Sequence, residues 1–160
     1  MTLQLAAYHE AGHAVAVLVT NFHTLPLPIR ASASGHGELG PGLSRRRCAA
    51  ASKQPDPADP DIARELALIA CAGFQAEDLF AQKAGLTPDP SAATDDETLA
   101  GLTLKAAHLP VDLISIKLQA RALMETHWNK VDVIAKAVLS SPRNMIDGMD
   151  AYELLELPIP

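Results

Sequence analysis

The stretch Tyr8–Val15 reads YHEAGHAV and places His9 and His13 four residues apart, with Glu10 directly after the first histidine. The surrounding residues 2–20 are rich in Ala, Leu and Val, which predicts a first helix. Because residues i and i+4 lie on one face of a helix, the two imidazoles point toward the same place. The pattern therefore indicates either a metal site on a helix or two histidines held by ordinary hydrogen bonds.

Two imidazoles on one helix face are a ligand pair that zinc accepts, with bonds of about 2.0–2.1 Å and room for a third protein ligand and a water. Zinc lowers the pKa of this water toward ~7, and Glu10 is placed to take its proton as hydroxide attacks a carbonyl. The same carboxyl group can then protonate the leaving amine. The motif predicts a zinc hydrolase in which His9 and His13 hold the metal and Glu10 is the general base.

A catalytic zinc site needs a third protein ligand, and the residues alone leave it open among Asp95, Asp96, Glu77, His23 and His36. The two aspartates stand near the start of a predicted helix, where the helix dipole favours acidic side chains without any metal. Glu77 falls on the apolar stripe of another predicted helix. It is therefore either a ligand or an acceptor for the second ring nitrogen of a ligand histidine. His36 lies in the glycine-rich stretch GHGELGPG, which is poor support for a rigid site.

The rest of the chain predicts a mainly helical (α+β) domain, a helical bundle with a small sheet. Gly12 costs about 1 kcal/mol in helix propensity and indicates close approach of another backbone. Asp59-Pro60 is a good helix start, with Gly85 as the C-terminal cap of that helix. Thr94 to Glu97 has the form of a capping box. Helices are expected over residues 2–20, 60–83, 94–108 and 111–141, the last with a break near Trp128, and a short final helix near Asp150.

The predicted sheet lies between the first two of these helices and has an exposed edge. Pro26 and Pro28 cannot donate to a sheet ladder, so the strand begins late or lies at an edge. We expect the segment from Ile29 to Ser44 to lie near the metal and to pair with a substrate backbone by strand addition. Residues 45–60, which open on three consecutive arginines, are expected to form an exposed loop.

Composition limits the class of protein. A chain of 160 residues, 48% hydrophobic and 20% charged, suits one globular domain covering residues 1–160. The formal charge of −6 argues against a general affinity for nucleic acid or an anionic membrane. The apolar runs are shorter than the ~20 residues of a membrane helix, no signal peptide opens the chain, and the two cysteines form no CxxC pair. We expect a cytoplasmic protein.

The stretch AYHEAGHAV resembles the zinc motif of the FtsH-type ATP-dependent metalloproteases. CAGFQAEDLF, residues 71–80, is similar to that family's helix with a glycine pair followed by Ala-Glu-Glu-Leu. AATDDETLA, residues 92–100, is similar to its Gly-Ala-x-x-Asp-Leu segment, and MIDGMDAYELL, residues 145–155, to its closing turn and helix. HEAGH is specific. The other blocks are individually weak and strengthen one another by their order and spacing.

The resemblance implies a zincin-like metallopeptidase domain whose third zinc ligand falls on Asp96. Alanine stands where the family has glycine, and a second aspartate lies directly before Asp96. A shift of the match by one residue would place the ligand at Asp95 instead. Glu77 becomes a residue that supports the metal ligands. The family's proteases carry an ATPase module and a membrane anchor before the peptidase domain. This chain has seven residues before Tyr8 and no GxxxxGK[ST] loop, so we expect a peptidase domain without its own motor.

The leading hypothesis is a zinc metalloendopeptidase acting on unfolded or flexible polypeptides, with a separate ATPase or a homo-oligomer as the partner that would present other substrates. The alternative is a catalytically silent zinc-containing domain that binds polypeptides as an adaptor. An intact Glu10 favours the enzyme, because a binding module needs no general base. A purely structural zinc is disfavoured, because such sites usually have four ligands rich in cysteine. His23, His36 and Tyr152 are all chemically able to stabilise the oxyanion.

Overall fold

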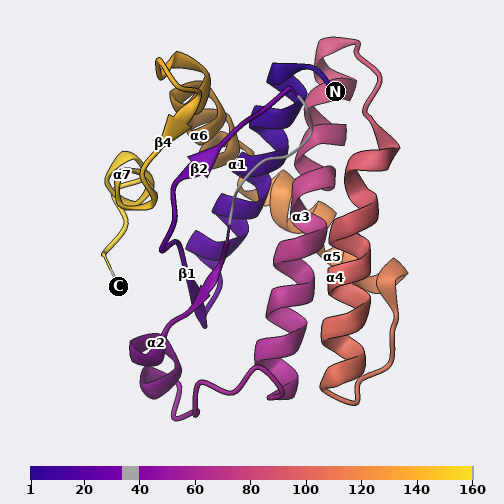
Figure 1. Cartoon of the computed structure of the whole chain (residues 1–160), viewed down its shortest axis with the longest axis vertical. Helices are drawn as coiled ribbons and strands as arrows, with labels where there is room; N and C mark the ends of the chain where they lie inside the picture. Colours follow the sequence, from indigo (N-terminus) through magenta and orange to yellow (C-terminus); the bar gives the residue numbers. More distant parts are fainter. Residues whose placement is uncertain (34–39, 160) are drawn as a thin grey trace.

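The computed structural model describes residues 1–33 and 40–159, so the candidate ligand His36 lies outside the described residues. The described chain is mainly helical, as predicted (Figure 1). Its helices are α1 Leu3–Val19, α2 Arg45–Ala50, α3 Pro60–Ala84, η1 Pro90–Ala92, α4 Ala93–Ala106, α5 Leu113–Thr126, α6 Trp128–Ser140 and α7 Gly148–Leu154. Its short strands are β1 His23–Thr24, β2 Ile29–Arg30, β3 Gly42–Leu43 and β4 Met145–Ile146. Within these residues, no helix has the length and apolar character needed to cross a membrane.

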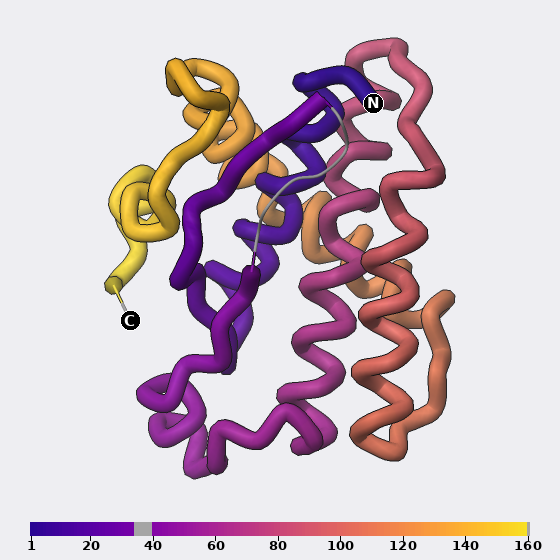
Figure 2. The backbone as a smooth tube through the Cα atoms, in the orientation of Figure 1, coloured from indigo at the N-terminus to yellow at the C-terminus, as the bar shows by residue number. Residues whose placement is uncertain are grey.

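Helix α1 is the centre of the molecule. The side chain of Thr2 caps its N-terminus by accepting from the backbone N–H of Leu5, and every residue from Leu5 to Leu18 is buried. A helix that is apolar nearly all round must be covered on all sides. Accordingly α3 packs against one side and α6 against another (Figure 1). The chain that follows α1 runs back beside it, which brings β1 and β2 against the same helix (Figure 2).

Helix α3 forms as the sequence predicts and lies between α1 and α4. Asp59 caps its N-terminus ahead of Pro60, and Gly85 ends it in the left-handed conformation with φ of 67°. The predicted close approach at Gly12 is confirmed. A Cβ atom on Gly12 would lie 2.6 Å from Cβ of Ala76 and 2.7 Å from the carbonyl oxygen of Ala72. Helices α1 and α3 can therefore cross with their backbones almost in contact.

The predicted capping box at Thr94 is wrong, whereas the predicted last helix near Asp150 is confirmed. The capping box at Thr94 does not form, because η1 leads directly into α4 and Thr94 already lies inside that helix. Asp89 caps this turn by accepting from the backbone N–H of Ser91. The last helix begins at Gly148, and its capping box is made by Asp147 and Asp150. The predicted break between the two long C-terminal helices is confirmed at His127.

The predicted single sheet is replaced by two separate antiparallel pairs. His23 and Thr24 of β1 pair with Leu43 and Gly42 of β3. The second pair joins β2 to β4, with Ile29 opposite Ile146 and Arg30 opposite Met145. Local sequence could not reveal this second pair, because β4 follows α6 and reaches β2 only once the helices have packed.

The prediction of an exposed loop over residues 45–60 is wrong at its start, where α2 forms behind the N-cap of Ser44. Arg47 points inward and its Nη1 donates to the carbonyl oxygens of Val17, Thr20 and His23 at 3.3, 3.1 and 2.7 Å. The last carbonyl groups of a helix lack partners within the helix. Arg47 supplies donors to them and ties α2 to the end of α1.

Candidate metal centre

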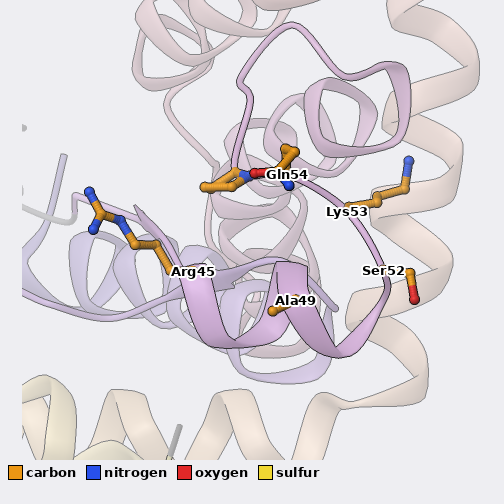
Figure 3. Close-up of a pocket in the computed structure, with 6 residues that line it drawn as sticks. Arg45, Ala49, Ser52, Lys53 and Gln54 are labelled. Atoms are coloured by element: carbon orange, nitrogen blue, oxygen red, sulfur yellow. The ribbon is translucent and has the colours of Figure 1, made fainter.

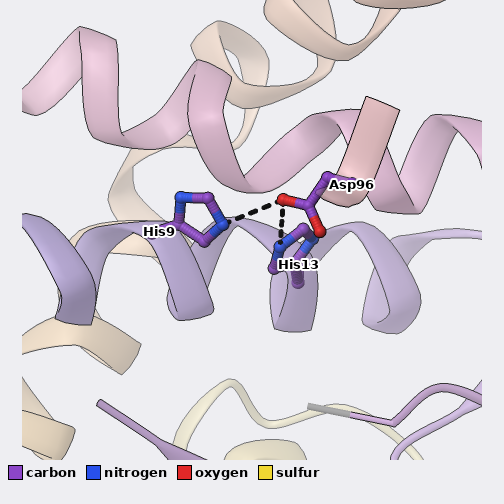
Figure 4. Close-up of side chains that lie close together, drawn as sticks. All are labelled: His9, His13 and Asp96. Atoms are coloured by element: carbon purple, nitrogen blue, oxygen red, sulfur yellow. Dashed lines mark hydrogen bonds and ion pairs between the residues drawn. The ribbon is translucent and has the colours of Figure 1, made fainter. Parts of the chain in front are cut away.

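Three side chains from two helices converge on one point (Figure 4). His9 and His13 come from α1, and Asp96 comes from the first turn of α4. Oδ2 of Asp96 lies 3.0 Å from Nε2 of His9 and 3.2 Å from Nε2 of His13. Bonds of 2.0–2.1 Å to a tetrahedral zinc ion would separate the ligand atoms by about 3.3 Å. Two of the separations are close to this value, and all three atoms lie within 4.8 Å of one another, so the group could hold a metal ion.

The structure distinguishes the sequence candidates for the third ligand. Asp96 joins the two histidines, whereas the neighbouring Asp95 is exposed and outside the group. Glu77 and His23 do not belong to the group either. Asp96 is thus the residue that the structure brings to the histidines, in the register that the resemblance implied.

Each histidine is oriented by its other ring nitrogen. Nδ1 of His9 lies 3.0 Å from Oε2 of the fully buried Glu77, whose Oε1 accepts from the backbone N–H of Asp89 at 2.9 Å. Nδ1 of His13 donates to the carbonyl oxygen of Ile69 at 2.8 Å. Hydrogen bonds of this kind fix the ring tautomer and orientation of metal-binding histidines. Glu77 therefore takes the supporting position that the sequence left as one of its two options.

This arrangement leaves acceptor atoms facing one another. A carbonyl oxygen can only accept, so the Nδ1 atom of His13 carries a hydrogen and Nε2 of the neutral ring carries a lone pair. That lone pair points at a carboxylate oxygen of Asp96. Two acceptors at this distance repel unless a proton or a cation lies between them. Two imidazole nitrogens and a carboxylate oxygen are a donor set that a divalent metal ion can accept.

The backbone of α3 forms the floor of the centre at Gly73. A Cβ atom there would lie 2.3 Å from Nε2 of His13 and 2.7 Å from Nε2 of His9. The hydrogen side chain of Gly73 thus keeps open the space between the two nitrogens that a metal ion would use. The sequence alone assigned Gly73 no role in the site. The available signal was a glycine in the middle of a long helix, which costs about 1 kcal/mol in helix propensity.

The pKa values of His9, His13 and Asp96 are shifted by their interactions with one another. Burial lowers the pKa of His9, but its hydrogen bonds to Asp96 and Glu77 outweigh burial and raise the pKa to about 9. Burial also opposes protonation of His13, whose pKa is nevertheless raised by Asp96. Burial would raise the pKa of Asp96, but the two imidazoles hold it well below its usual range. The site therefore has an electrostatic preference for positive charge between these three side chains.

Glu10 lies beside the centre and is buried. The residue is 7% exposed, and among residues 1–33 and 40–159 no protein group donates a hydrogen bond to its carboxylate. Burial raises the pKa of Glu10, while the nearby imidazoles of His13 and His9 partly oppose that rise. A carboxylate without protein donors can accept a proton from a water that approaches the centre.

Tyr8 anchors the start of the motif and takes no part in the metal cluster. Its ring stacks on Phe80 and Trp128, with centroid separations of 3.8 and 5.6 Å. Its hydroxyl group donates to Oδ1 of Asp132 at 2.6 Å. These contacts fix α1 against α3 and α6 one residue before His9.

The two described candidates for stabilising an oxyanion have partners elsewhere in the fold. Nδ1 of His23 lies 2.8 Å from Oε1 of Glu65. The fully buried Tyr152 shares a hydrogen bond of 3.0 Å with Oγ1 of Thr24. Neither residue joins the metal cluster.

The segment expected to form an edge near the metal is extended at both described ends, in β2 and β3. Pro41, just before β3, lines a small pocket together with His13 and Asp96. This part of the segment therefore reaches the centre. Strand addition by a substrate stays a prediction.

A larger hollow of about 680 Å³ lies at α2 and the chain that follows it (Figure 3). Its charged side chains, Arg45 and Lys53, point away from one another in Figure 3, and Lys53 is paired with Asp59 and Asp61. The lining contains neither a histidine nor a carboxylate. This hollow therefore lacks the chemistry of the centre at His9, His13 and Asp96.

Comparison of the chain with protein-family models and with curated proteins gave no match. The case for a metal centre therefore rests on the residues and their geometry.

Proposed function

We propose that this protein is a zinc-dependent metallopeptidase with a zincin-like domain, which hydrolyses peptide bonds in unfolded or flexible polypeptides. The observation that supports it most is the meeting of Nε2 of His9, Nε2 of His13 and Oδ2 of Asp96 within 4.8 Å of one another. Two imidazoles and one carboxylate, with a further position open, are the ligand set of many catalytic zinc sites. When bound, zinc supplies Lewis-acid chemistry by acidifying water and polarising a carbonyl group.

The residues of this chain divide the remaining work. His9 and His13 present lone pairs because Glu77 and Ile69 hold their Nδ1 atoms. Asp96 contributes negative charge from the other side. Glu10 accepts the proton of the attacking water at its carboxylate and returns it to the leaving amine, which is general base and then general acid catalysis. Burial of the centre strengthens each of these electrostatic interactions.

The accessible substrates follow from the chemistry that these residues supply. They bind and cut a peptide, and none of them unfolds a protein. A compact domain is unfolded only for a tiny fraction of the time, so it should resist cleavage. Unstructured peptides should be cut directly. A separate ATPase, or assembly of several copies, would be needed to present folded substrates.

The experiment compares wild type with Glu10→Gln, both loaded with zinc, on a library of unstructured peptides. Glu10→Gln keeps the shape of the side chain and all three metal ligands, so zinc content should be unchanged. Hydrolysis should fall by about 10²–10⁴-fold, the usual effect of losing general acid–base catalysis. Glu125→Gln, at an exposed ion pair on α5, is the matched control and should cut like wild type.

Two outcomes would contradict the proposal. Iron in place of zinc in the purified protein, measured by elemental mass spectrometry, would indicate a different metal chemistry. If zinc-loaded wild type cuts nothing while it and Glu10→Gln bind the same peptides equally, the protein is the silent polypeptide-binding adaptor instead.

A further inference from the structure

A small pocket opens directly beside the metal centre. Two of the metal ligands form part of its wall, and the rest of the wall is mainly apolar. Its volume is about 50 Å³, and its lining includes His13, Asp96, Pro41, Leu66, Ile69 and Leu99. The pocket thus combines residues from α1, α3, α4 and the chain before β3.

We propose that this pocket is a subsite that selects a small aliphatic side chain, such as that of alanine or valine, next to the scissile peptide bond. The proposal rests on the proposed peptidase function and adds a substrate class to it. A peptide carbonyl bound at the metal lies beside His13 and Asp96. Because these residues also line the pocket, an adjacent side chain of the substrate can enter it.

The lining and the volume together determine the preference. Apolar walls reject a charged or amide side chain, because it would lose its hydrogen bonds to water without replacement. An apolar cavity that binds benzene has a volume of about 150 Å³. A pocket of about 50 Å³ therefore excludes an aromatic ring and accommodates only a few carbon atoms.

The same elements that build the metal centre set the dimensions of the pocket. Leu99 lies one helical turn after Asp96 on α4, and it is 46% exposed at the surface. Leu66 lies almost one turn before Ile69, whose carbonyl oxygen holds His13. Leu99 is the wall residue that can be shortened with least harm to the fold, because it is already half exposed.

The first experiment maps cleavage sites in the unstructured peptide library by mass spectrometry. Wild type should cut mainly where alanine or valine occupies one of the two positions flanking the bond, with phenylalanine and tryptophan depleted there. Leu99→Ala should relax this preference and raise the relative kcat/KM for a leucine or phenylalanine peptide by about 10-fold or more, the scale of one or two methylene groups in an apolar pocket. Leu102→Ala is the matched control, because Leu102 is 61% exposed on the same helix and does not line the pocket.

A second experiment needs no catalysis. The hydroxamates of alanine, valine and phenylalanine carry the same metal-binding group on different side chains. Calorimetry with zinc-loaded Glu10→Gln should find the alanine and valine compounds bound about 10-fold or more tightly than the phenylalanine compound, and Leu99→Ala should reduce this difference.

The outcomes separate the subsite from the peptidase. Cleavage without discrimination by size, or identical preferences in Leu99→Ala and Leu102→Ala, would overturn the subsite and leave the peptidase in place. Absence of cleavage together with size-selective hydroxamate binding would overturn the peptidase and support the pocket as a binding subsite. Equal binding of the three hydroxamates would overturn the subsite whether or not peptides are cut.

Discussion

Among residues 1–33 and 40–159, two buried clusters of histidine and carboxylate lie close to α1, and one of them, His9, His13 and Asp96, could hold a metal ion. The cluster past the C-terminus of α1 joins His23 to Glu65. Glu65 accepts from the backbone N–H groups of Asn21, Phe22 and His23 at 2.7, 2.7 and 3.0 Å, and it contacts Nδ1 of His23 at 2.8 Å. The carboxylate of Glu65 is surrounded by donors, which fix the turn from α1 into β1.

The cluster in the middle of α1 has the opposite arrangement. The Nδ1 atoms of His9 and His13 face the acceptors Glu77 and Ile69, and their Nε2 atoms face the carboxylate of Asp96. Acceptor atoms therefore face one another, and a proton or a metal ion between them would relieve the repulsion. Burial and closeness of a histidine to a carboxylate therefore do not identify a metal centre. What distinguishes the two clusters is whether the carboxylate is surrounded by donors or faces ring nitrogens that have acceptors on their other side.

The largest expected difference is between replacing the candidate ligand His13 and replacing His23, which contacts Glu65. His13→Ala removes one of three protein ligands and should weaken zinc binding by at least about 100-fold, more than the loss of a supporting residue. His23→Ala leaves acceptors of Glu65 unfilled and should cost about 1–3 kcal/mol of unfolding free energy while zinc stays bound. Elemental mass spectrometry and urea titration measure the two effects. Zinc loss in both variants, or in neither, would remove the distinction between the clusters.

A second prediction tests the floor of the centre without touching a ligand. Gly73→Ala places a methyl group against Nε2 of both histidines and should weaken zinc binding by about the 10–100-fold seen on disturbing ligand support, or by more. Gly101→Ala is the control. Its Cβ atom would lie 3.6 Å from Cγ1 of Val111, an ordinary contact, and helix propensity favours alanine by about 1 kcal/mol. Calorimetric zinc titration should separate the two, and equal affinity would show that the space above Gly73 is not used.

A third prediction compares the two buried glutamates. Glu77→Gln keeps an acceptor for His9 but removes its charge, so zinc affinity should fall by about 10–100-fold. Glu65→Gln should leave zinc affinity unchanged and lower stability, because Glu65 supports a turn outside the centre. Competition with a chromogenic chelator measures the affinities. Similar zinc affinities in the two variants would mean that Glu77 does not support His9 in metal binding.

The features that could be predicted from the sequence are those set by residues close together in the chain. The spacing of His9 and His13 acts within one helix, and the helix boundaries at Thr2, Asp59 and Gly85 are set by neighbouring residues. Periodicity left the third ligand open, and resemblance to a known motif supplied Asp96. The choice depends on α4 packing across α3, which no local pattern encodes.

The wrong predictions also concern features that depend on contacts outside the local pattern. The predicted capping box at Thr94 failed because η1 had already started the helical turn. The arginines were assigned to a loop because charge runs are usually solvated, whereas Arg47 is drawn inward by the carbonyl groups at the end of α1. The pocket beside the centre joins residues 41, 66 and 99, so it exists only after folding.

The smallest expected effect is the pH dependence of stability that arises from Glu65 in the cluster with His23. Burial raises the pKa of Glu65, but the hydrogen bonds from His23 and from the backbone N–H groups of Asn21 and Phe22 outweigh burial and lower it. A carboxylate with a depressed pKa in the folded state contributes stability above its unfolded value of ~4.3, and this stability is lost as pH falls through the folded pKa. Glu65→Gln lacks this contribution at every pH.

The difference in unfolding free energy between wild type and Glu65→Gln should therefore stay constant from pH 7 to about pH 5 and shrink below about pH 4, as protons fill the carboxylate of wild type. Both proteins should be measured free of zinc, so that metal release on acidification does not enter the comparison. Urea titrations at each pH provide the difference. A difference that grows on acidification would mean that Glu65 is held protonated in the folded state. In that case the carboxyl group of Glu65 would donate a hydrogen bond as well as accept them. Glu65 would then no longer be a carboxylate surrounded by donors, and its contrast with Asp96, which faces acceptor nitrogens, would be lost.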